Sequence, residues 1–189
     1  MSRFIGPRLK IVRRLGELPG LSLKKSKREG SPGQHGNSAA KRARKNNTSQ
    51  YNSRLQEKQK LRYHYGITES QLLNYIRKAR KKQGSTGDVL LQLLEMRLDC
   101  LVFRLGLAPT IRAARQIVNH GHILVNKKAL NIPSYQCQVT DCIEVKDSKA
   151  AKNLSLSTTS SFIANVVSSE QITLNVNPRL IVEYYSRKI

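Results

Sequence analysis

The chain has 189 residues, of which 34 are Lys or Arg and 12 are Asp or Glu, so its formal net charge is +22. This charge opposes compaction unless an anionic partner neutralises it, although 39% apolar residues suffice for a modest core. No run approaches the roughly 18 consecutive apolar residues of a membrane-spanning helix, and the cations are spread along the chain, which argues against a membrane as that partner. The composition therefore predicts a folded nucleic-acid-binding protein.

The N-terminus and the cysteines restrict the chemistry further. Arg13 and Arg14 interrupt the only apolar stretch near the N-terminus, so no secretory signal is predicted. Cys100, Cys137 and Cys142 are odd in number and widely spaced without a CxxC pair, which is typical of buried thiols in a reducing compartment. We expect no metal and no cofactor. No Gly-rich nucleotide loop or nucleophile and base pair indicates an enzyme.

Residues 1 to about 50 are predicted to form a basic arm, because they lack a sustained apolar period. Two runs of like charge, residues 24–30 and 41–47, would repel and stay solvated in isolation. Between them the segment SPGQHG predicts tight turns that display Gln34 and His35. A disordered tail is the alternative for the arm considered alone.

Behind the arm the pattern becomes helical. Leucines and tyrosines among cations predict a helix that ends at Gly66. Thr68 followed three residues later by Gln71 predicts a capping box at the start of a second helix, which is closed by Gly84. Five cations near the end of this helix exceed what the helix dipole requires, so we expect RNA contacts there. They are Arg77, Lys78, Arg80, Lys81 and Lys82.

A third apolar period begins at Asp88, and within it Arg97 and Arg104 are predicted on one helix face because they stand seven residues apart. Thr110 is predicted to cap the next helix, which ends at Gly121. The predicted core stripe of that helix consists of Ile111, Ala114, Ile117 and Val118. Its opposite face carries Arg112, Arg115, Gln116 and Asn119. Guanidinium and amide groups suit phosphate oxygens and base edges.

The hydrophobic period then shifts to two. HILVN and CIEV predict short strands, with turns at Asn126-Lys127 and at Pro133-Ser134. Two helices followed by small strands are therefore expected from residue 96 to about residue 146. Beyond a weakly patterned stretch, the last 28 or so residues add short apolar segments that we expect to pack on the helical part.

The chain resembles the small-subunit ribosomal protein four family over nearly its whole length. The matching segments occur in the family's order: SPGQHG, EKQKLRYHYGITESQLLNYIRKA, GSTGDVLLQLLEMRLD, ARQIVNHGHILVN, NIPSY and LIVEYYS. The most specific stretch, RLDCLVFRLGLAPTIRAARQIVNHGHILVN, resembles the RNA-binding module named after that family. LLQLLEMRLD and VEYYSR resemble plastid-encoded members most, so the resemblance implies a plastid (chloroplast) ribosome, with the bacterial cytoplasm as the alternative.

The resemblance implies an α+β fold with a helix-then-strand RNA-binding module inserted in a helical domain. The expected parts are a basic arm (1–50), a helical domain (51–95, completed by 158–189) and the module with its trailing linker (96–157). The implied function is that of a structural constituent of the small ribosomal subunit that binds the 5′ domain of its ribosomal RNA and acts early in assembly. Implied further partners are neighbouring ribosomal proteins, protein five among them, and mRNA where it enters, with an influence on translational accuracy. Neither a membrane nor a homo-oligomer is required.

Residue by residue, the resemblance implies RNA contacts at a first set of positions. These are Gln34, His35, Arg97, Arg104, Arg112, Arg115, Gln116, His120 and His122. For the histidines, packing or hydrogen bonding within the turn is the alternative. The other predicted RNA-binding residues are Asn119 and cations of the basic stretches: Arg3, Arg8, Arg13, Arg14, Lys41, Arg42, Arg44, Lys45, Arg54, Lys58, Arg62, Arg77, Lys78, Arg80, Lys81, Lys127 and Lys128.

The chain departs from the family pattern in three places. Some members carry a zinc site in the arm, but residues 1–50 contain no Cys. The family usually has Gly after the asparagine of the strand turn, where this chain has Lys127, and a positive φ costs more for Lys. The geometry of that turn therefore stays open. Residues 147–175 match poorly.

Two other functions are alternatives to a ribosomal role. An RNA-modifying enzyme or a synthetase can carry the same module. However, the roughly 140 residues outside the module consist largely of the basic arm and helices, and they show no catalytic signature. A general DNA or tRNA binder is the other alternative. Competition between DNA, tRNA and ribosomal RNA fragments would separate it from a ribosomal protein.

Overall fold

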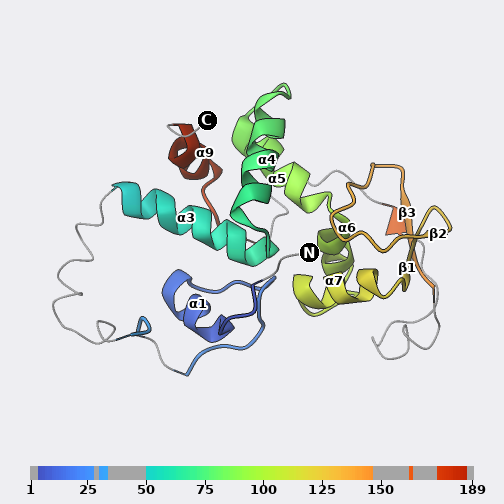
Figure 1. The fold of residues 1–189 in the computed structure, drawn as a ribbon, viewed down its shortest axis with the longest axis horizontal. Helices are drawn as coiled ribbons and strands as arrows, with labels where there is room; N and C mark the ends of the chain where they lie inside the picture. The colour runs from blue at the N-terminus through green and yellow to red at the C-terminus, as the bar shows by residue number, and fades with distance from the viewer. Residues whose placement is uncertain (1–3, 28–29, 34–49, 147–161, 164–173, 187–189) are drawn as a thin grey trace. The chain divides into compact units, whose positions relative to one another are not determined.

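The computed structural model describes residues 4–27, 30–33, 50–146, 162–163 and 174–186. The chain divides into two compact units, which are residues 1–90 with 173–189 and residues 91–172. Within the described ranges there are seven helices and one small antiparallel sheet, so the predicted α+β class is confirmed (Figure 1). Among the described helices, none combines the length and the apolar character that crossing a membrane requires.

The first unit is helical. Its elements are α1 (Arg8–Leu15), α3 (Gln50–Tyr65), α4 (Glu69–Arg80), the first part of α5 (Thr86–Glu95), and α9 (Pro178–Ser186). The predicted capping box is confirmed, because the Thr68 side chain accepts from the Gln71 N–H while the Gln71 side chain accepts from the Thr68 N–H. Gly66 ends α3 with a φ of 60°, a left-handed conformation that glycine adopts at little cost.

The predicted arm contains more structure than its sequence indicated. Residues 8–15 form helix α1, and the turn behind it buries Leu18 and Leu21, which are 1% and 2% exposed. The Leu21 N–H donates to the Leu18 carbonyl at 3.0 Å, so both leucines belong to one tight turn. The expectation of an arm without core residues is corrected for this segment, because two leucines in a turn leave no helical or strand period to detect.

The C-terminal helix α9 packs on α3 (Figure 1). The Arg54 guanidinium donates to the Glu183 carboxylate at 2.8 Å, and the Lys58 ammonium lies 4.4 Å from the centre of the Tyr184 ring. Tyr185 is buried and donates its hydroxyl hydrogen to Glu69 in the first turn of α4. The segment LIVEYYS thus joins α3 to the first turn of α4 through side-chain polar contacts as well as apolar ones.

The second unit combines two helices with the sheet. Its helices are α6 (Leu98–Arg104) and α7 (Ile111–Asn119), and its strands are β1 (Ile123–Val125), β2 (Lys128–Ala129), β3 (Cys142–Val145) and β4 (Phe162–Ile163). The strands lie in the order β2-β1-β3-β4, all antiparallel. Two helices followed by short strands were predicted for this stretch, and the structure confirms them.

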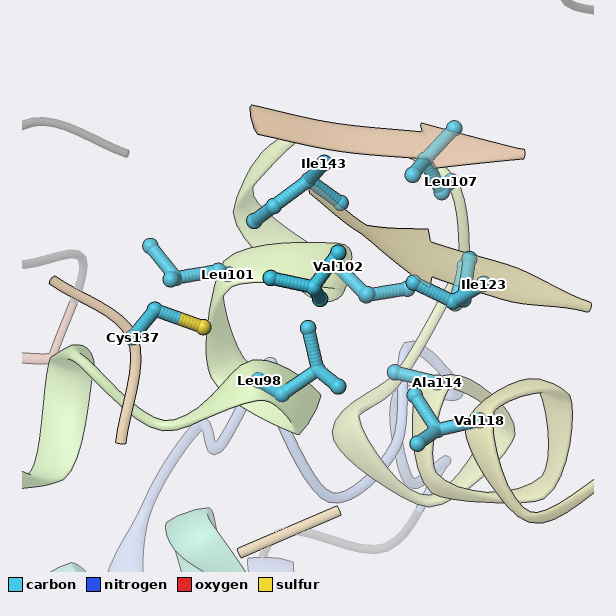
Figure 2. Close-up of a cluster of buried hydrophobic side chains, with 11 residues drawn as sticks. Leu98, Leu101, Val102, Leu107, Ala114, Val118, Ile123, Cys137 and Ile143 are labelled. Carbon is cyan, nitrogen blue, oxygen red and sulfur yellow. The ribbon is translucent and has the colours of Figure 1, made fainter. Parts of the chain in front are cut away.

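A single apolar core joins the helices of this unit to its sheet (Figure 2). Figure 2 shows Leu98 and Val102 of α6 between Val118 of α7 and the strand residues Ile123 and Ile143. All five are at most 1% exposed. Full burial of such side chains contributes about 1.5–3 kcal/mol each, so this core fixes how α7 faces solvent.

The strand turn that the sequence left open keeps its left-handed geometry. Asn126 and Lys127 have φ values of 50° and 64°, and Val125 pairs with Lys128, so the two residues form the loop of a tight hairpin. The Asn126 amide offsets the strain at Lys127 by donating to Asp141 at 2.8 Å and accepting from the Cys142 N–H at 2.9 Å. Lysine therefore occupies a position that favours glycine without loss of the turn.

Candidate nucleic-acid interface

Helix α7 exposes part of the face that the sequence predicted for RNA contact. Thr110 caps it as predicted, since its hydroxyl oxygen accepts from the Ala113 N–H at 3.2 Å. The buried residues of the helix are Ile111, Ala114 and Val118. Gln116, Asn119 and His120 are exposed, and Arg112 is half-buried. Amide and imidazole groups thus lie on the outer side of the helix, where a base edge or a phosphate can reach them.

The assignment of Ile117 to the core is corrected. Ile117 is only half-buried and packs against the core from its edge. It directly precedes Val118, and neighbouring helix residues differ by about 100° in direction, so only one of the two can face the sheet squarely.

Arg115 and Arg97 occupy a buried ion-pair network instead of an exposed face. The Asp99 carboxylate, which is fully buried, accepts two hydrogen bonds from Arg97 at 2.9 and 2.8 Å. It accepts two more from Arg115 at 3.1 and 2.7 Å. The predicted outward position of Arg115 is therefore corrected. Its side chain is 11% exposed, and its guanidinium forms an ion pair with the Asp99 carboxylate.

Arg97 is also not on the helix face predicted for it. It precedes α6 as the N-cap residue, and it is 1% exposed, so it shares no outer face with Arg104. Arg104 is half-buried and lies 3.8 Å from the Glu95 carboxylate. The Arg97 guanidinium, which the fold encloses and pairs with Asp99, cannot reach an RNA phosphate without a rearrangement of the core.

Four further predicted contact residues lie in the segments directly before and directly after β1. Lys127 and Lys128 are exposed on the β1-β2 hairpin. His120 and His122 follow the end of α7, with ring centres 6.0 Å apart, and His120 is exposed. The structure thus brings four predicted contact residues to turns at the surface of one small unit.

The end of α4 carries the densest exposed charge in the described part of the first unit. Its predicted contact residues Arg77, Lys78, Arg80 and Lys81 are all exposed, as is the neighbouring Lys82. Among the described residues, none of the five forms an ion pair with an acidic side chain. Cations at a helix C-terminus favour the helix dipole by only about 0.3–1 kcal/mol each. Their charge is therefore left for an external anion.

Helices α1 and α3 divide the other predicted cations between surface and interior. Arg8 and Arg14 of α1 are exposed, whereas the half-buried Arg13 donates to the Gly30 carbonyl at 2.9 Å. Lys58 of α3 is 5% exposed and donates to Glu69 at 3.0 Å, so its predicted outward position is corrected. Arg62 lies 4.6 Å from the centre of the Tyr63 ring.

The remaining predicted contacts lie outside the described residues. They are Arg3, Gln34, His35, Lys41, Arg42, Arg44 and Lys45.

Cys100 and Cys137 are buried in environments that suppress the chemistry of their thiols. Burial raises the pKa of the Cys100 thiol well above its usual value, and it raises the pKa of Cys137 to about 12. Within the described ranges, no three His, Cys, Asp or Glu side chains are grouped so that they could hold a metal ion.

Sequence reasoning missed the buried carboxylate that organises the second unit. Asp99 stands two residues from Arg97 but sixteen from Arg115. The Arg-Leu-Asp spacing could have suggested the first pair, since both residues flank the start of a helix. Nothing local indicates the second pair, because α7 brings Arg115 to Asp99 only after the two helices pack.

A strongly basic chain with a helix-then-strand unit and exposed amides, imidazoles and cations has the features of an RNA-binding protein. Residues 96–143 match the family described as S4 domain, and residues 3–95 match the family described as Ribosomal protein S4/S9 N-terminal domain. The chain belongs to the small ribosomal subunit protein uS4 family, whose members are structural ribosomal proteins. The prediction of a ribosomal protein that is not an enzyme is thereby confirmed.

Curated relatives match over the whole chain. Small ribosomal subunit protein uS4c of Prototheca wickerhamii is 51% identical over 207 residues, and all of both chains is covered. Small ribosomal subunit protein uS4 of Thermosynechococcus vestitus is 51% identical over 208 residues with the same coverage. The uS4c protein of Oltmannsiellopsis viridis is 50% identical over 205 residues, which cover 99% of this chain and 100% of that one.

Proposed function

We propose that the chain binds the 5′ domain of small-subunit ribosomal RNA early in subunit assembly, through exposed cations on both of its units. The observation that carries this proposal is the end of α4, where five exposed cations have no acidic partner among the described residues. Such an unpaired cluster is costly for a free protein through self-repulsion, and RNA phosphates remove that cost while releasing counterions.

The second unit contributes recognition of a different kind. Gln116, Asn119 and His120 offer hydrogen-bonding groups on the outer side of α7, and Lys127 and Lys128 offer charge at the hairpin. Ionic contacts fix where a protein lies on RNA, while amides and rings discriminate unpaired bases. The α4 cluster therefore supplies affinity, and the α7 face supplies specificity.

Three predicted contacts receive a structural role in this proposal. Arg97 and Arg115 complete the buried Asp99 network, and Lys58 joins α3 to α4 and α9. Their substitution would weaken RNA binding only by destabilising the fold that presents the exposed cations.

The test compares two charge-matched double variants in full-length protein. Arg77→Gln with Arg80→Gln removes two unpaired cations, and Lys25→Gln with Lys60→Gln removes two cations that are paired with Glu17 and Glu57. Wild-type affinity for a 5′-domain fragment should fall about a thousandfold between 50 and 200 mM salt if about six or more phosphates are contacted.

The first variant should lower the salt slope by about one unit per lost phosphate contact, that is by about two, and the second should leave it near that of wild type. Equal slopes for the two variants would show that net charge alone acts. A nearly salt-independent wild-type affinity, or equal affinity for DNA, tRNA and the 5′-domain fragment, would contradict specific ribosomal RNA binding.

The location of the chain in the cell and its neighbours in the ribosome are a further part of this proposal. We assign the chain to a plastid ribosome, next to ribosomal protein five and to the path by which mRNA enters, with an effect on translational accuracy. Two observations support this proposal. The segments LLQLLEMRLD and VEYYSR resemble those of plastid-encoded members, and uS4c and cyanobacterial uS4 relatives are about 50% identical to the chain. The bacterial cytoplasm is the alternative. Cofractionation of the tagged chain with small subunits from isolated chloroplasts, and cross-linking to protein five within them, test this setting directly.

A further inference from the structure

The hairpin between β1 and β2 holds a lysine in a backbone conformation that glycine adopts at much lower cost. Lys127 has a φ of 64°, in the left-handed region where a Cβ atom crowds the neighbouring backbone. Its side chain is exposed, so burial does not offset this strain. Strained backbone at a residue that contributes nothing to the core is typical of positions that bind a ligand.

The preceding residue, Asn126, fixes this conformation through its contacts with the start of β3. The Asn126 N–H donates to the Cys142 carbonyl at 2.9 Å, and the Asn126 side-chain oxygen accepts from the Cys142 N–H at 2.9 Å. The Asn126 side-chain nitrogen donates to the Asp141 carboxylate at 2.8 Å. These hydrogen bonds hold Asn126 at a φ of 50°, and they orient the peptide bond that leads into Lys127.

Asp141 is the buried end of this network. Its side chain is 6% exposed, and its second carboxylate oxygen accepts from the Gln138 N–H at 2.7 Å. Within the described ranges Asp141 forms no ion pair with a Lys, Arg or His side chain. Burying a carboxylate without a cationic partner is costly, and its hydrogen bonds are what stabilise it here. Both oxygens of Asp141 therefore serve to fix turns, one of which is the hairpin that carries Lys127.

The hairpin presents two adjacent cations to solvent. Lys127 and Lys128 are both exposed, and neither forms an ion pair with an acidic side chain in the described part of the chain. A lysine on a mobile loop loses backbone as well as side-chain entropy when it orders on a phosphate, whereas a lysine on a fixed backbone loses less. The held turn thus sets the position of the Lys127 backbone before an anion binds.

We propose that Asp141 is a positioning residue for RNA binding, because through Asn126 it holds the turn that directs Lys127 towards a backbone phosphate. Asp141 is buried, and its negative charge alone would oppose the binding of a phosphate. Its removal should therefore weaken RNA binding, which is the opposite of what net charge predicts. The proposal rests on the proposed RNA binding and adds to it a residue that acts through another one.

The experiment measures the affinity of full-length variants for a 5′-domain ribosomal RNA fragment over a range of salt concentrations. Lys127→Gly removes the cation together with the strain. It should weaken binding about five- to eightfold at about 100 mM salt and lower the salt slope by about one, without a fall in melting temperature.

Asp141→Asn places an amide donor beside one of the donors that Asp141 accepts from, so it should loosen the turn. Binding should weaken by a smaller factor, about two- to fivefold, because the cation is still present although the net charge rises by one. Glu144→Gln, three residues on in β3, is the charge-matched control and should leave binding unchanged or tighter.

Repeating Asp141→Asn in the Lys127→Gly background separates positioning from general support of the fold. If Asp141 acts through Lys127, the added substitution should not weaken binding further, because glycine offers no cation to position. Asn126→Gly should show the same dependence on Lys127, since it accepts a left-handed φ but loses the link to Asp141, and it replaces Asp141→Asn if that variant does not fold.

Three results would overturn the proposal and leave the proposed function intact. Equal weakening by Asp141→Asn in both backgrounds would show that Asp141 only supports the fold. Tighter binding by the single Asp141→Asn variant would show that charge alone acts. Wild-type affinity of Lys127→Gly would show that the hairpin does not contact the RNA. If the wild-type chain does not bind the fragment, the proposed function and the positioning role are both overturned.

Discussion

Both units hold a cation inside with a carboxylate in the first turn of a helix, but they enclose the carboxylate to different depths. In the first unit Glu69, at the start of α4, accepts from Lys58 and Tyr185, and its side chain is 37% exposed. In the second unit Asp99, in the first turn of α6, accepts from Arg97 and Arg115 and is fully buried. Water can replace a lost partner at Glu69, whereas nothing can replace one at Asp99. The ion pair at Glu69 therefore contributes modestly to the stability of the first unit, whereas the folded state of the second unit requires the ion pairs at Asp99.

The electrostatics of the first unit show its partial hydration. Burial acts to raise the pKa of Glu69, but the hydrogen bonds from Tyr185 and Lys58 outweigh it and leave that pKa below its usual value. Burial, together with the hydrogen bond to Glu69, raises the pKa of Tyr185 well above its usual value. The carboxylate therefore stays ionised and the phenol stays neutral at physiological pH, which is the state that joins α4 to α9.

The largest effect expected from this comparison is that of Asp99→Asn. Removing the charge leaves two enclosed guanidinium groups without their acid, and breaking a buried pair in this way costs about 3–5 kcal/mol. Urea unfolding monitored by circular dichroism measures the loss. Asp88→Asn, a half-buried aspartate in the first turn of α5, is the control and should cost only the helix-dipole contribution of about 0.3–1 kcal/mol. Similar losses of unfolding free energy for the two variants would contradict the claim that the Asp99 ion pairs are essential to the fold of the second unit.

A second prediction tests whether the first unit includes the turn that follows α1. Leu18→Ala should destabilise the protein by about 2–5 kcal/mol, because it opens a cavity at a side chain that is 1% exposed. Leu23→Ala, five residues on at a side chain that is 63% exposed, should stay within about 0.5 kcal/mol of wild type. Thermal melts of both variants check this. If the two variants had equal melting temperatures, the turn after α1 would not belong to the core of the first unit, and the segment would be an arm as the sequence predicted.

The third prediction concerns pH and belongs to the first unit alone. His64 is 2% exposed, its Nδ1 accepts from the Gly20 N–H at 3.4 Å, and burial lowers its pKa from 6.5 to about 4. The unfolded chain therefore binds a proton at a higher pH than the folded one, so the stability from neutral His64 is complete above pH 6.5 and is lost as pH falls towards 4. The loss is about 3 kcal/mol, at 1.36 kcal/mol for each unit of pKa.

His64→Gln supplies the control for this titration, because its amide can still accept from Gly20 but does not titrate. Urea unfolding of wild type between pH 7 and pH 4 should show the loss, and the variant should show a flatter curve over that window. A wild-type profile as flat as that of the variant would contradict the buried neutral histidine.

The smallest effect expected is that of Glu69→Gln. The amide can still accept from Tyr185, and the lost ion pair is partly hydrated, so the cost should be about 0.5–1.5 kcal/mol and should shrink at high salt. Unfolding at two salt concentrations measures it against Asp99→Asn, whose loss should hardly depend on salt because its site excludes ions. A Glu69→Gln loss as large as that of Asp99→Asn would show that depth of burial does not set the difference.

Local sequence signals determined the helices between residues 50 and 120, the caps of α4 and α7, and the hairpin. Thr68 with Gln71, Thr110, and the stops at Gly66 and Gly121 lie where they were predicted, because caps and left-handed stops act over three or four residues. The outward position of Gln116 and Asn119 was also readable, since polar residues at helical spacing opposite a buried stripe face solvent. The family's module could likewise be identified from sequence, because its signature is a contiguous stretch.

Tertiary structure alone decided which cations face solvent. Helical spacing placed Arg115 opposite the core, but packing brought a buried Asp99 to it, and a carboxylate without water attracts any guanidinium within reach. Lys58 was drawn inward by Glu69 and Tyr184 in the same way, although 11 and 126 residues separate it from them. A spacing rule describes one element at a time, whereas the burial of a charge depends on partners that other elements supply. For this reason the sequence by itself determined the family and most of the elements other than α1 and α9, and the fold determined which of the basic residues remain available for RNA.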